Sequence, residues 1–203
     1  MTTEGSIGGI GTGAPTGDSS IVNRMIRAAR LDSNLYEEVE ADRTATSQAA
    51  IVVAITAAAA AIGGALSAVT GGDTASAVGG IVSGLVFSLF YWVVWSYLTY
   101  FIGTRFFGGT ASPGELLRTL GFASSPRIFN ILSFIPVVGG LIGIATSIWS
   151  LIAGIIAVRQ ALDFDTSKAV LTALIAWVIT MIPIIVLGGI VAAFFIGAAA
   201  ATS

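Results

Sequence analysis

The residues of this chain that could take part in chemistry are a few ionisable side chains in otherwise apolar surroundings. Glu115 and Asp163 could pair as a general acid and a general base, although no spacing in the sequence sets the distance between them. The chain has no His and no Cys, which excludes Ser-His-Asp triads, His-based zinc motifs, disulfides and thiolate metal sites. No GxxxxGK(S/T) phosphate loop occurs. We therefore expect no enzymatic activity, no catalytic residue, no metal and no cofactor.

The stretch from Ser112 to Arg127 is unusually polar for its place between two long apolar runs. Its opening Ser-x-x-Glu sequence has the form of a helix capping box. We expect its ionisable and polar residues to form a buried cluster with two neighbours; the members are Glu115, Arg118, Ser124, Ser125, Arg127, Asn130 and Asp163. An arginine at mid-bilayer costs at least ~2.5–3.5 kcal/mol unless it finds partners or water. Both a structural and a functional role for Arg127 stay open.

The composition indicates an integral membrane protein. Of the 203 residues 55% are hydrophobic and only 10% are charged, against roughly 25% charged in soluble domains. No charged residue lies between Arg43 and Asp73, between Asp73 and Arg105, between Arg127 and Arg159, or after Lys168. Each of these intervals is longer than the ~20 apolar residues that a spanning helix needs. One all-α membrane domain is therefore expected.

The number of spans depends on whether residues 113–135 cross the membrane. The other spans are expected at about residues 47–69, 75–103, 138–158 and 169–196. If 113–135 also crosses, every Lys and Arg of the loops falls on one side, as the positive-inside rule requires. We therefore predict a five-helix transmembrane bundle with a third helix broken at Ser125-Pro126, a cytoplasmic N-terminus and an outside C-terminus.

The sequence before the first span divides into two parts. Residues 1–20 are rich in Gly, Ser and Thr and are expected to be a disordered tail; residues 21–46 form a cytoplasmic or interfacial helical segment, and residues 47–197 form the membrane domain. A short amphipathic helix is predicted from Ile21, with Arg24, Arg27 and Arg30 on one face. These arginines could contact membrane headgroups, or the helix could dock on the protein's own cytoplasmic face. Both interpretations stay open.

Small and aromatic residues mark the expected contact faces of the spans. Small residues four apart let helices approach closely in lipid, and the candidates are Gly80, Gly84, Gly139 and Gly143. Aromatic residues crowd the later half of the second span. Tyr91, Trp92 and Trp95 belong either to an interfacial belt or to a contact with a bound lipid or pigment.

Four segments of the chain resemble a known family. They read LYEEVEADRTATSQA, YFIGTRFFGGTASPGELLRTLGFASSPRIF, IPVVGGLIG and WSLIAGIIAVRQALDFDTSKAVLTALI. Together they are similar to prokaryotic members of the Yip (Ypt-interacting-protein) domain family over about residues 20–195. The resemblance implies a five-span α-helical membrane domain with a cytoplasmic N-terminus. Eukaryotic members bind small GTPases, but the long N-terminal region of those proteins is missing here, and we do not expect GTPase binding.

These observations favour a non-enzymatic membrane scaffold or adaptor in the cell (inner or plasma) membrane. It would bind partner membrane proteins or lipids, for example as an accessory subunit of a respiratory or photosynthetic complex. The alternatives are a small transporter or permease built around the broken third helix, and a membrane-shaping protein. A net charge of −2 argues against nucleic acid as a partner.

Overall fold

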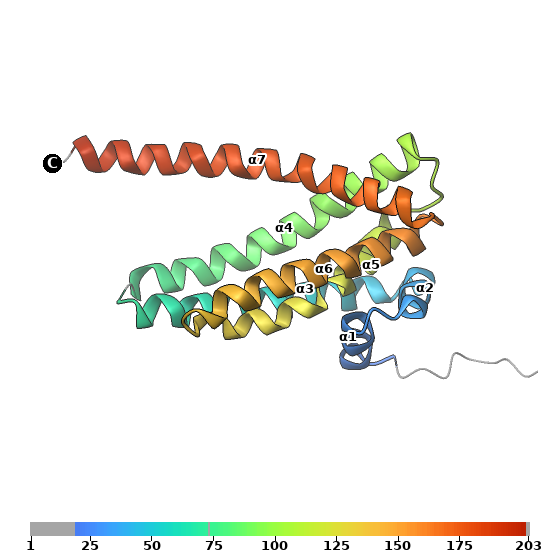
Figure 1. The fold of residues 1–203 in the computed structure, drawn as a ribbon, viewed down its shortest axis with the longest axis horizontal. Coiled ribbons are helices and arrows are strands. Elements are labelled where there is room, and N and C mark those ends of the chain that lie inside the picture. The colour runs from blue at the N-terminus through green and yellow to red at the C-terminus, as the bar shows by residue number, and fades with distance from the viewer. Residues whose placement is uncertain (1–18, 73, 202–203) are drawn as a thin grey trace, which may run out of the picture.

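The computed structural model describes residues 19–72 and 74–201, and the regular structure in these ranges is all helical (Figure 1). The elements in chain order are α1 (Ile21–Ala29), α2 (Ser33–Ala41), α3 (Ala45–Thr70), α4 (Thr74–Phe106), α5 (Pro113–Ala123), the 3₁₀ helix η1 (Ser125–Phe134), α6 (Val138–Ala161) and α7 (Thr166–Ala201). The predicted all-α fold class is confirmed for the described residues. Residues 1–18 of the predicted tail lie outside them.

Short polar side chains define where several of these helices begin. The Ser20 hydroxyl accepts the Asn23 amide at the start of α1, and Asp165 accepts the Lys168 amide at the start of α7. At the start of α5 the Ser112 and Glu115 side chains accept each other's backbone amides. The predicted capping box is therefore present, and it satisfies two amides that the helix itself cannot pair.

Four helices of the described chain are long and apolar enough to cross a membrane, rather than the five predicted. These candidate spans are Ala45–Thr70, Gly80–Phe106, Val138–Ala161 and Thr166–Pro183. The first three agree with predicted spans to within about five residues, and the fourth begins three residues before the predicted last span and ends at Pro183, ahead of the predicted residue 196. The predicted third span is divided into α5 and η1, each of which is too short to cross a bilayer alone.

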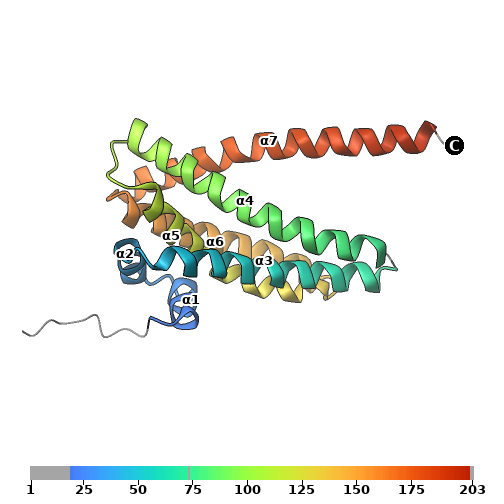
Figure 2. The ribbon, with the colours of Figure 1, turned by 180° about the vertical axis from the view of Figure 1, so that it is seen from behind.

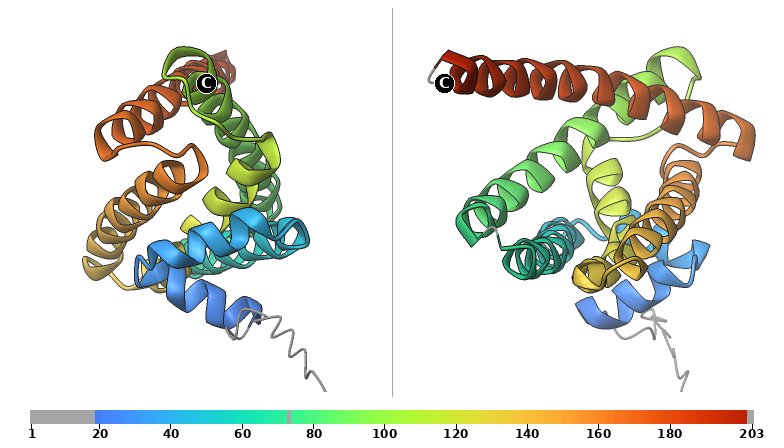
Figure 3. Two further views of the ribbon diagram at one scale, coloured as in Figure 1. Left: turned by 90° about the vertical axis from the view of Figure 1, so that its right-hand side faces the viewer. Right: turned by 60° about the vertical axis from the view of Figure 1, so that its left-hand side comes forward.

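The long helices form a bundle with two distinct ends (Figures 1 and 2). One end, which we call the polar end, contains α2, the start of α5, the end of α6 and the start of α7, and α2 packs there on α5 and α6. The turns from α3 to α4 and from η1 to α6 lie at the far end. Helix α7 crosses α4 and then runs away from α3 and α6, on the side of the bundle opposite α1 (Figure 3).

The main apolar core lies near the polar end, where α2, α3, α5 and α6 meet. Its largest fully buried side chains include Tyr36 and Leu35 of α2 and Phe122 of α5. Alanines of α3 and α6 surround them, and their small side chains let the helices approach closely. Because α2 contributes to this core, the segment before the first span packs directly against the long helices.

Among the four glycines predicted to mark packing faces, only Gly139 lies at a close backbone contact. A Cβ atom there would collide with the carbonyl of Ser133 in η1, whereas Gly80, Gly84 and Gly143 have open space beside them. The tight contacts are instead at Gly63, against η1, and at Gly121, where a Cβ would lie 2.7 Å from the Cβ of Ala49. Helix α3 therefore packs directly on the backbones of α5 and η1.

Candidate functional site

The polar end is held together by arginines of α1 that pair with acids around α2. Arg24 is 3% exposed, and its guanidinium contacts Glu38 and Asp42, each at 2.9 Å, and donates to Gln48 at 2.8 Å. Arg27 pairs with Asp32 at 2.8 Å and with Glu38 at 2.5 Å. These interactions lower the pKa of Asp32, because the neighbouring guanidinium stabilises its charged form.

This arrangement turns the arginine face of α1 towards the protein. Of the three arginines predicted to contact the membrane surface, Arg24 and Arg27 are engaged with α2, and Arg30 is exposed. The outward side chains are Val22, 66% exposed, and Ile26, 47% exposed. The arginine face of α1 thus docks on the protein, and contact of this helix with the membrane surface stays a prediction.

Arg118 links α5 to the backbone of α2. Its Nε donates to the Val39 carbonyl at 2.9 Å, and its Nη2 donates to the carbonyl of Glu40. Both carbonyls belong to the last turn of α2, where a helix lacks internal donors for its carbonyls. Arg118 therefore serves as a structural cap for α2, and its guanidinium is not free to act on a ligand.

The two carboxylates considered as an acid–base pair line one cavity of about 510 Å³ at the polar end. Glu115 is engaged in the capping box, and Asp163 accepts a hydrogen bond from Thr110 at 2.9 Å. Glu40 lies in the same cavity, and its pKa is raised to about 7 by partial burial and by the nearby charges of Glu115 and Asp163. No group of three acids suited to a metal ion occurs among the described residues.

Arg127 lies away from the polar end, near the middle of the bundle. The residue three positions before it, Ser124, has its hydroxyl 3.4 Å from that of Thr56 in α3. Thr56 is roughly 17 Å along α3 from its first residue at 1.5 Å per residue. The predicted polar cluster is therefore divided: Glu115, Arg118 and Asp163 belong to the polar end, and Arg127 does not.

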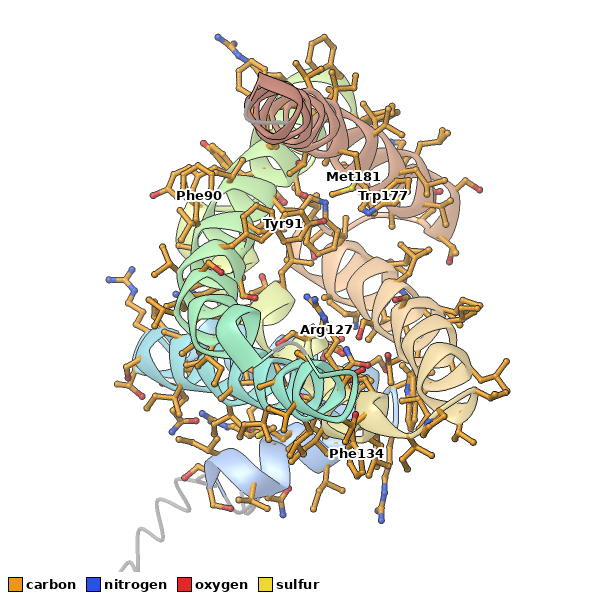
Figure 4. All side chains as sticks on the ribbon, turned by 90° about the vertical axis from the view of Figure 1, so that its left-hand side faces the viewer. Phe90, Tyr91, Arg127, Phe134, Trp177 and Met181 are labelled. Carbon is orange, nitrogen blue, oxygen red and sulfur yellow. The ribbon has the colours of Figure 1, made fainter. Side chains whose placement is uncertain are left out.

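The Arg127 side chain points into a cleft bounded by α4, η1, α6 and α7, and the cleft has a volume of about 310 Å³ (Figure 4). A smaller cavity of about 60 Å³ adjoins it on the α3 and α5 side. We call the two together the Arg127 cleft. The residues that line both parts are Ser88, Tyr91, Trp95, Arg127 and Ser150.

Three hydrogen-bond donors of this cleft are without a partner in the described part of the chain. The Arg127 guanidinium makes no ion pair or hydrogen bond there. Arg127 is an exposed residue, whereas the indole Nε1 of Trp95 and the hydroxyl of Ser150 are buried and likewise unpaired. Buried donors are normally satisfied, and an unsatisfied one costs about 1–3 kcal/mol. The site therefore has the capacity to bind a group that accepts hydrogen bonds.

Aromatic side chains form one wall of the Arg127 cleft. Phe87, Tyr91 and Trp95 stack along α4, with ring centroids 6.4 Å and 6.2 Å apart. Trp177 and Met181 of α7 face Arg127 across the cleft (Figure 4). Trp92 lines the smaller cavity and donates to the Leu117 carbonyl at 3.0 Å. The aromatic residues noted in the sequence thus divide between the cleft and the contact of α4 with α5.

The polar residues predicted to hold Arg127 have other partners. Ser124 and Ser125 donate to carbonyls of α5, at 2.7 Å and 2.6 Å, which satisfies the end of that helix. The Asn130 side-chain oxygen accepts from Thr146 of α6 at 2.6 Å. Asn130 and Ser124 line the cleft, but their hydrogen bonds stabilise the break between α5 and η1.

Sequence reasoning missed Ser88, Ser150, Trp177 and Met181 as parts of the site. Ser88, Tyr91 and Trp95 are spaced i, i+3 and i+7, so they share one face of α4. From this spacing the sequence could have predicted that Ser88 lines the same site as the two aromatic residues. The contribution of α7 had no such signal, because it depends on the angle at which α7 crosses α4.

The described helices and their apolar lengths define a multi-pass membrane protein. The family model of the Yip1 domain matches residues 33–188, and the chain belongs to this family, as the resemblance indicated. No curated protein and no solved structure matches the chain.

Proposed function

We propose that this Yip1-family protein is a non-enzymatic membrane scaffold or adaptor that binds partner membrane proteins or lipids. The observation that carries the proposal is the uncovered face of α4, where only 11% of the apolar window is buried, against 39% for α3. Its exposed side chains recur every three or four residues in one continuous stripe: Val82, Val86, Phe90, Val93, Tyr97 and Phe101. This stripe is a long, preformed surface for contact within the membrane.

The ionisable groups support a role without catalysis. Glu115 caps α5, Arg118 caps α2, and Arg24 joins α1 to α2. Each of these side chains is committed to holding the polar end together. The result is a rigid cytoplasmic cap on a membrane domain, which suits a protein that positions partners.

We further propose that α5 and η1 together make a fifth crossing. At 1.5 Å per residue the 11 residues of α5 extend ~16 Å, and at 2.0 Å per residue the 10 residues of η1 extend ~20 Å. Their sum of ~36 Å exceeds the ~30 Å thickness of the hydrocarbon core. The irregular turn at Ser124 and Ser125 packs against α3, as irregular backbone in a membrane must be buried in protein.

The scaffold proposal is tested by photo-crosslinking in the native membrane. A photoreactive residue at Phe90, on the α4 stripe, is expected to give a discrete adduct with a membrane protein. The matched control is Ile148, which is 55% exposed on α6. It is expected to give only diffuse lipid labelling. Identical diffuse labelling from both positions would argue against a protein partner on α4.

A further inference from the structure

The unpaired groups of the Arg127 cleft share one chemical property. Arg127, the indole of Trp95 and the hydroxyl of Ser150 are all available to donate hydrogen bonds. A ligand that satisfies all three must present acceptors, and an oxyanion presents several of them around one centre.

The charge of the cleft leads to the same class of ligand. Arg127 carries a positive charge, and no Asp or Glu occurs among the described residues that line either part of the cleft. A guanidinium near the middle of a membrane is costly without a counter-charge. Guanidinium groups bind carboxylates and phosphates through paired hydrogen bonds. A negatively charged ligand would therefore satisfy both the charge and the free donors.

The walls of the cleft are apolar, which indicates that the ligand carries an apolar group as well as the oxyanion. The stacked rings of Phe87, Tyr91 and Trp95 form one side, and Trp177 and Met181 form the other. Phe87 is 48% exposed and Trp177 is 44% exposed, so the apolar lining of the cleft continues onto the outer surfaces of α4 and α7. A volume of about 310 Å³ is at the lower end of small-ligand sites, which suits a headgroup whose chains lie outside.

We propose that the Arg127 cleft binds the headgroup of a membrane amphiphile whose phosphate or carboxylate gives it a net negative charge and whose chains lie along the rim formed by α4 and α7. This inference rests on the proposed function, in which the protein binds membrane components, and it names one of them. Arg127, Trp95 and Ser150 would hold the oxyanion, and Tyr91 and Trp177 would contact the apolar part.

Lipid retention by the purified protein in a nonionic detergent tests the proposal, with native mass spectrometry as the readout. The probes are phosphatidylglycerol, phosphatidylcholine with the same acyl chains, and inorganic phosphate. We expect phosphatidylglycerol to bind at least tenfold more tightly than phosphatidylcholine, with one molecule per protein. Equal retention of the two lipids would overturn the proposal. Displacement of phosphatidylglycerol by an equal concentration of inorganic phosphate would show that the cleft takes a free anion, and would overturn the lipid assignment.

Substitutions locate the binding. Arg127→Gln is expected to lower the affinity for phosphatidylglycerol about tenfold, to that for phosphatidylcholine, and Arg127→Lys to retain part of the selectivity. The control is Arg105→Gln, at an exposed arginine near the end of α4. It removes the same charge away from the cleft and is expected to change nothing. Equal loss in both variants would show that the effect is non-specific, and an unchanged affinity in Arg127→Gln would also refute the site.

A second pair of variants covers the case in which Arg127→Gln fails to fold. Trp95→Phe removes the indole N–H and keeps a ring, and Ser150→Ala removes the hydroxyl with little change in volume. Each is expected to weaken phosphatidylglycerol binding about threefold, and wild-type affinity in the double variant would overturn the proposal. The lipid assays test the headgroup site, and the photo-crosslinking at Phe90 tests the scaffold proposal. Because the lipid assays use only purified protein and lipid, they can fail while Phe90 still crosslinks to a membrane protein. Conversely, crosslinking at Phe90 can fail while the purified protein still prefers phosphatidylglycerol.

Discussion

Two neighbouring glycines of α3 have opposite surroundings. A Cβ at Gly63 would collide with the backbone carbonyl of Asn130 in η1, whereas a Cβ at Gly64 would meet nothing within 4 Å. A backbone carbonyl cannot rotate away as a side chain can, so α3 and η1 would have to separate. Gly63 is thus a packing requirement, and Gly64 is not.

Replacement of each glycine by Ala should therefore have opposite effects. We expect Gly63→Ala to destabilise the folded protein by about 1–3 kcal/mol through overpacking. Gly64→Ala should be neutral or stabilising by up to about 1 kcal/mol, since Ala favours helix over Gly. Thermal unfolding in detergent, followed by circular dichroism, measures both. Equal melting temperatures for the two variants would contradict the close contact of α3 with η1.

Glu40 gives the polar end a pH dependence. Burial, and then the charges of Glu115 and Asp163, raise its pKa from 4.5 to about 7, while Arg118 opposes the shift and Glu37 adds to it. Between these two values the folded protein keeps a proton that the unfolded chain has lost. Stability should therefore fall as pH rises from about 4.5 to about 7, and then level off.

Glu40→Gln should remove this component of the pH dependence. Because the group is partly exposed and screened, we expect a modest gain of about 2 °C in melting temperature at pH 8, and no gain at pH 4.5. Melting temperatures of the wild type and the variant across this range provide the measurement. A constant difference between them at all pH values would show that Glu40 does not titrate in this window.

At the scale of elements, α1 shows how tertiary contacts choose between two faces of an amphipathic helix. The arginine face contacts α2 through Arg24 and Arg27, and Val22 and Ile26 point away from the protein. Trp149 of α6 also holds the end of this helix by donating to the Ala29 carbonyl at 2.7 Å. An outward apolar face beside a membrane domain is expected to contact lipid.

Spin labels can test that orientation, and the absence of native Cys makes single labels straightforward. In vesicles, a label at Val22→Cys should be more accessible to oxygen, which concentrates in lipid, than to a water-soluble nickel relaxant. A label at Arg30→Cys, directly after the same helix, should show the reverse preference. Greater accessibility of both positions to nickel would place α1 in water.

The elements that sequence could predict are those specified by local signals. The capping box at Ser112, the four long apolar helices and the end of α5 just before Ser125-Pro126 follow from residue types and spacing along the chain. The Arg127 cleft does not, because its walls come from helices whose crossing geometry is set by packing. The same holds for Gly63, whose role depends on how near η1 approaches.

At the scale of the whole molecule, the positive charges lie at one end. The chain has nine Lys and Arg residues. All but Arg127 lie in α1 or directly after it, between α2 and α3, near the end of α4, in α5, near the end of α6 or at the start of α7. By the positive-inside rule, such an asymmetry predicts that these segments lie on the cytoplasmic side. The far end, with the turns before α4 and α6, would then face outward.

Cysteine labelling of intact cells decides between five crossings and four. We expect Asn34→Cys, exposed in α2, to react with a membrane-impermeant maleimide only after the cells are permeabilised. Val137→Cys, in a turn where the native side chain is 86% exposed, should react in intact cells if α5 and η1 cross the membrane. If they do not cross, the Val137 turn lies on the same side as Asn34, and both cysteines will need permeabilisation. In the five-span arrangement Arg127 lies within the membrane, where an unpaired guanidinium is most costly. An oxyanion bound to Arg127 would therefore stabilise the folded protein most in this arrangement.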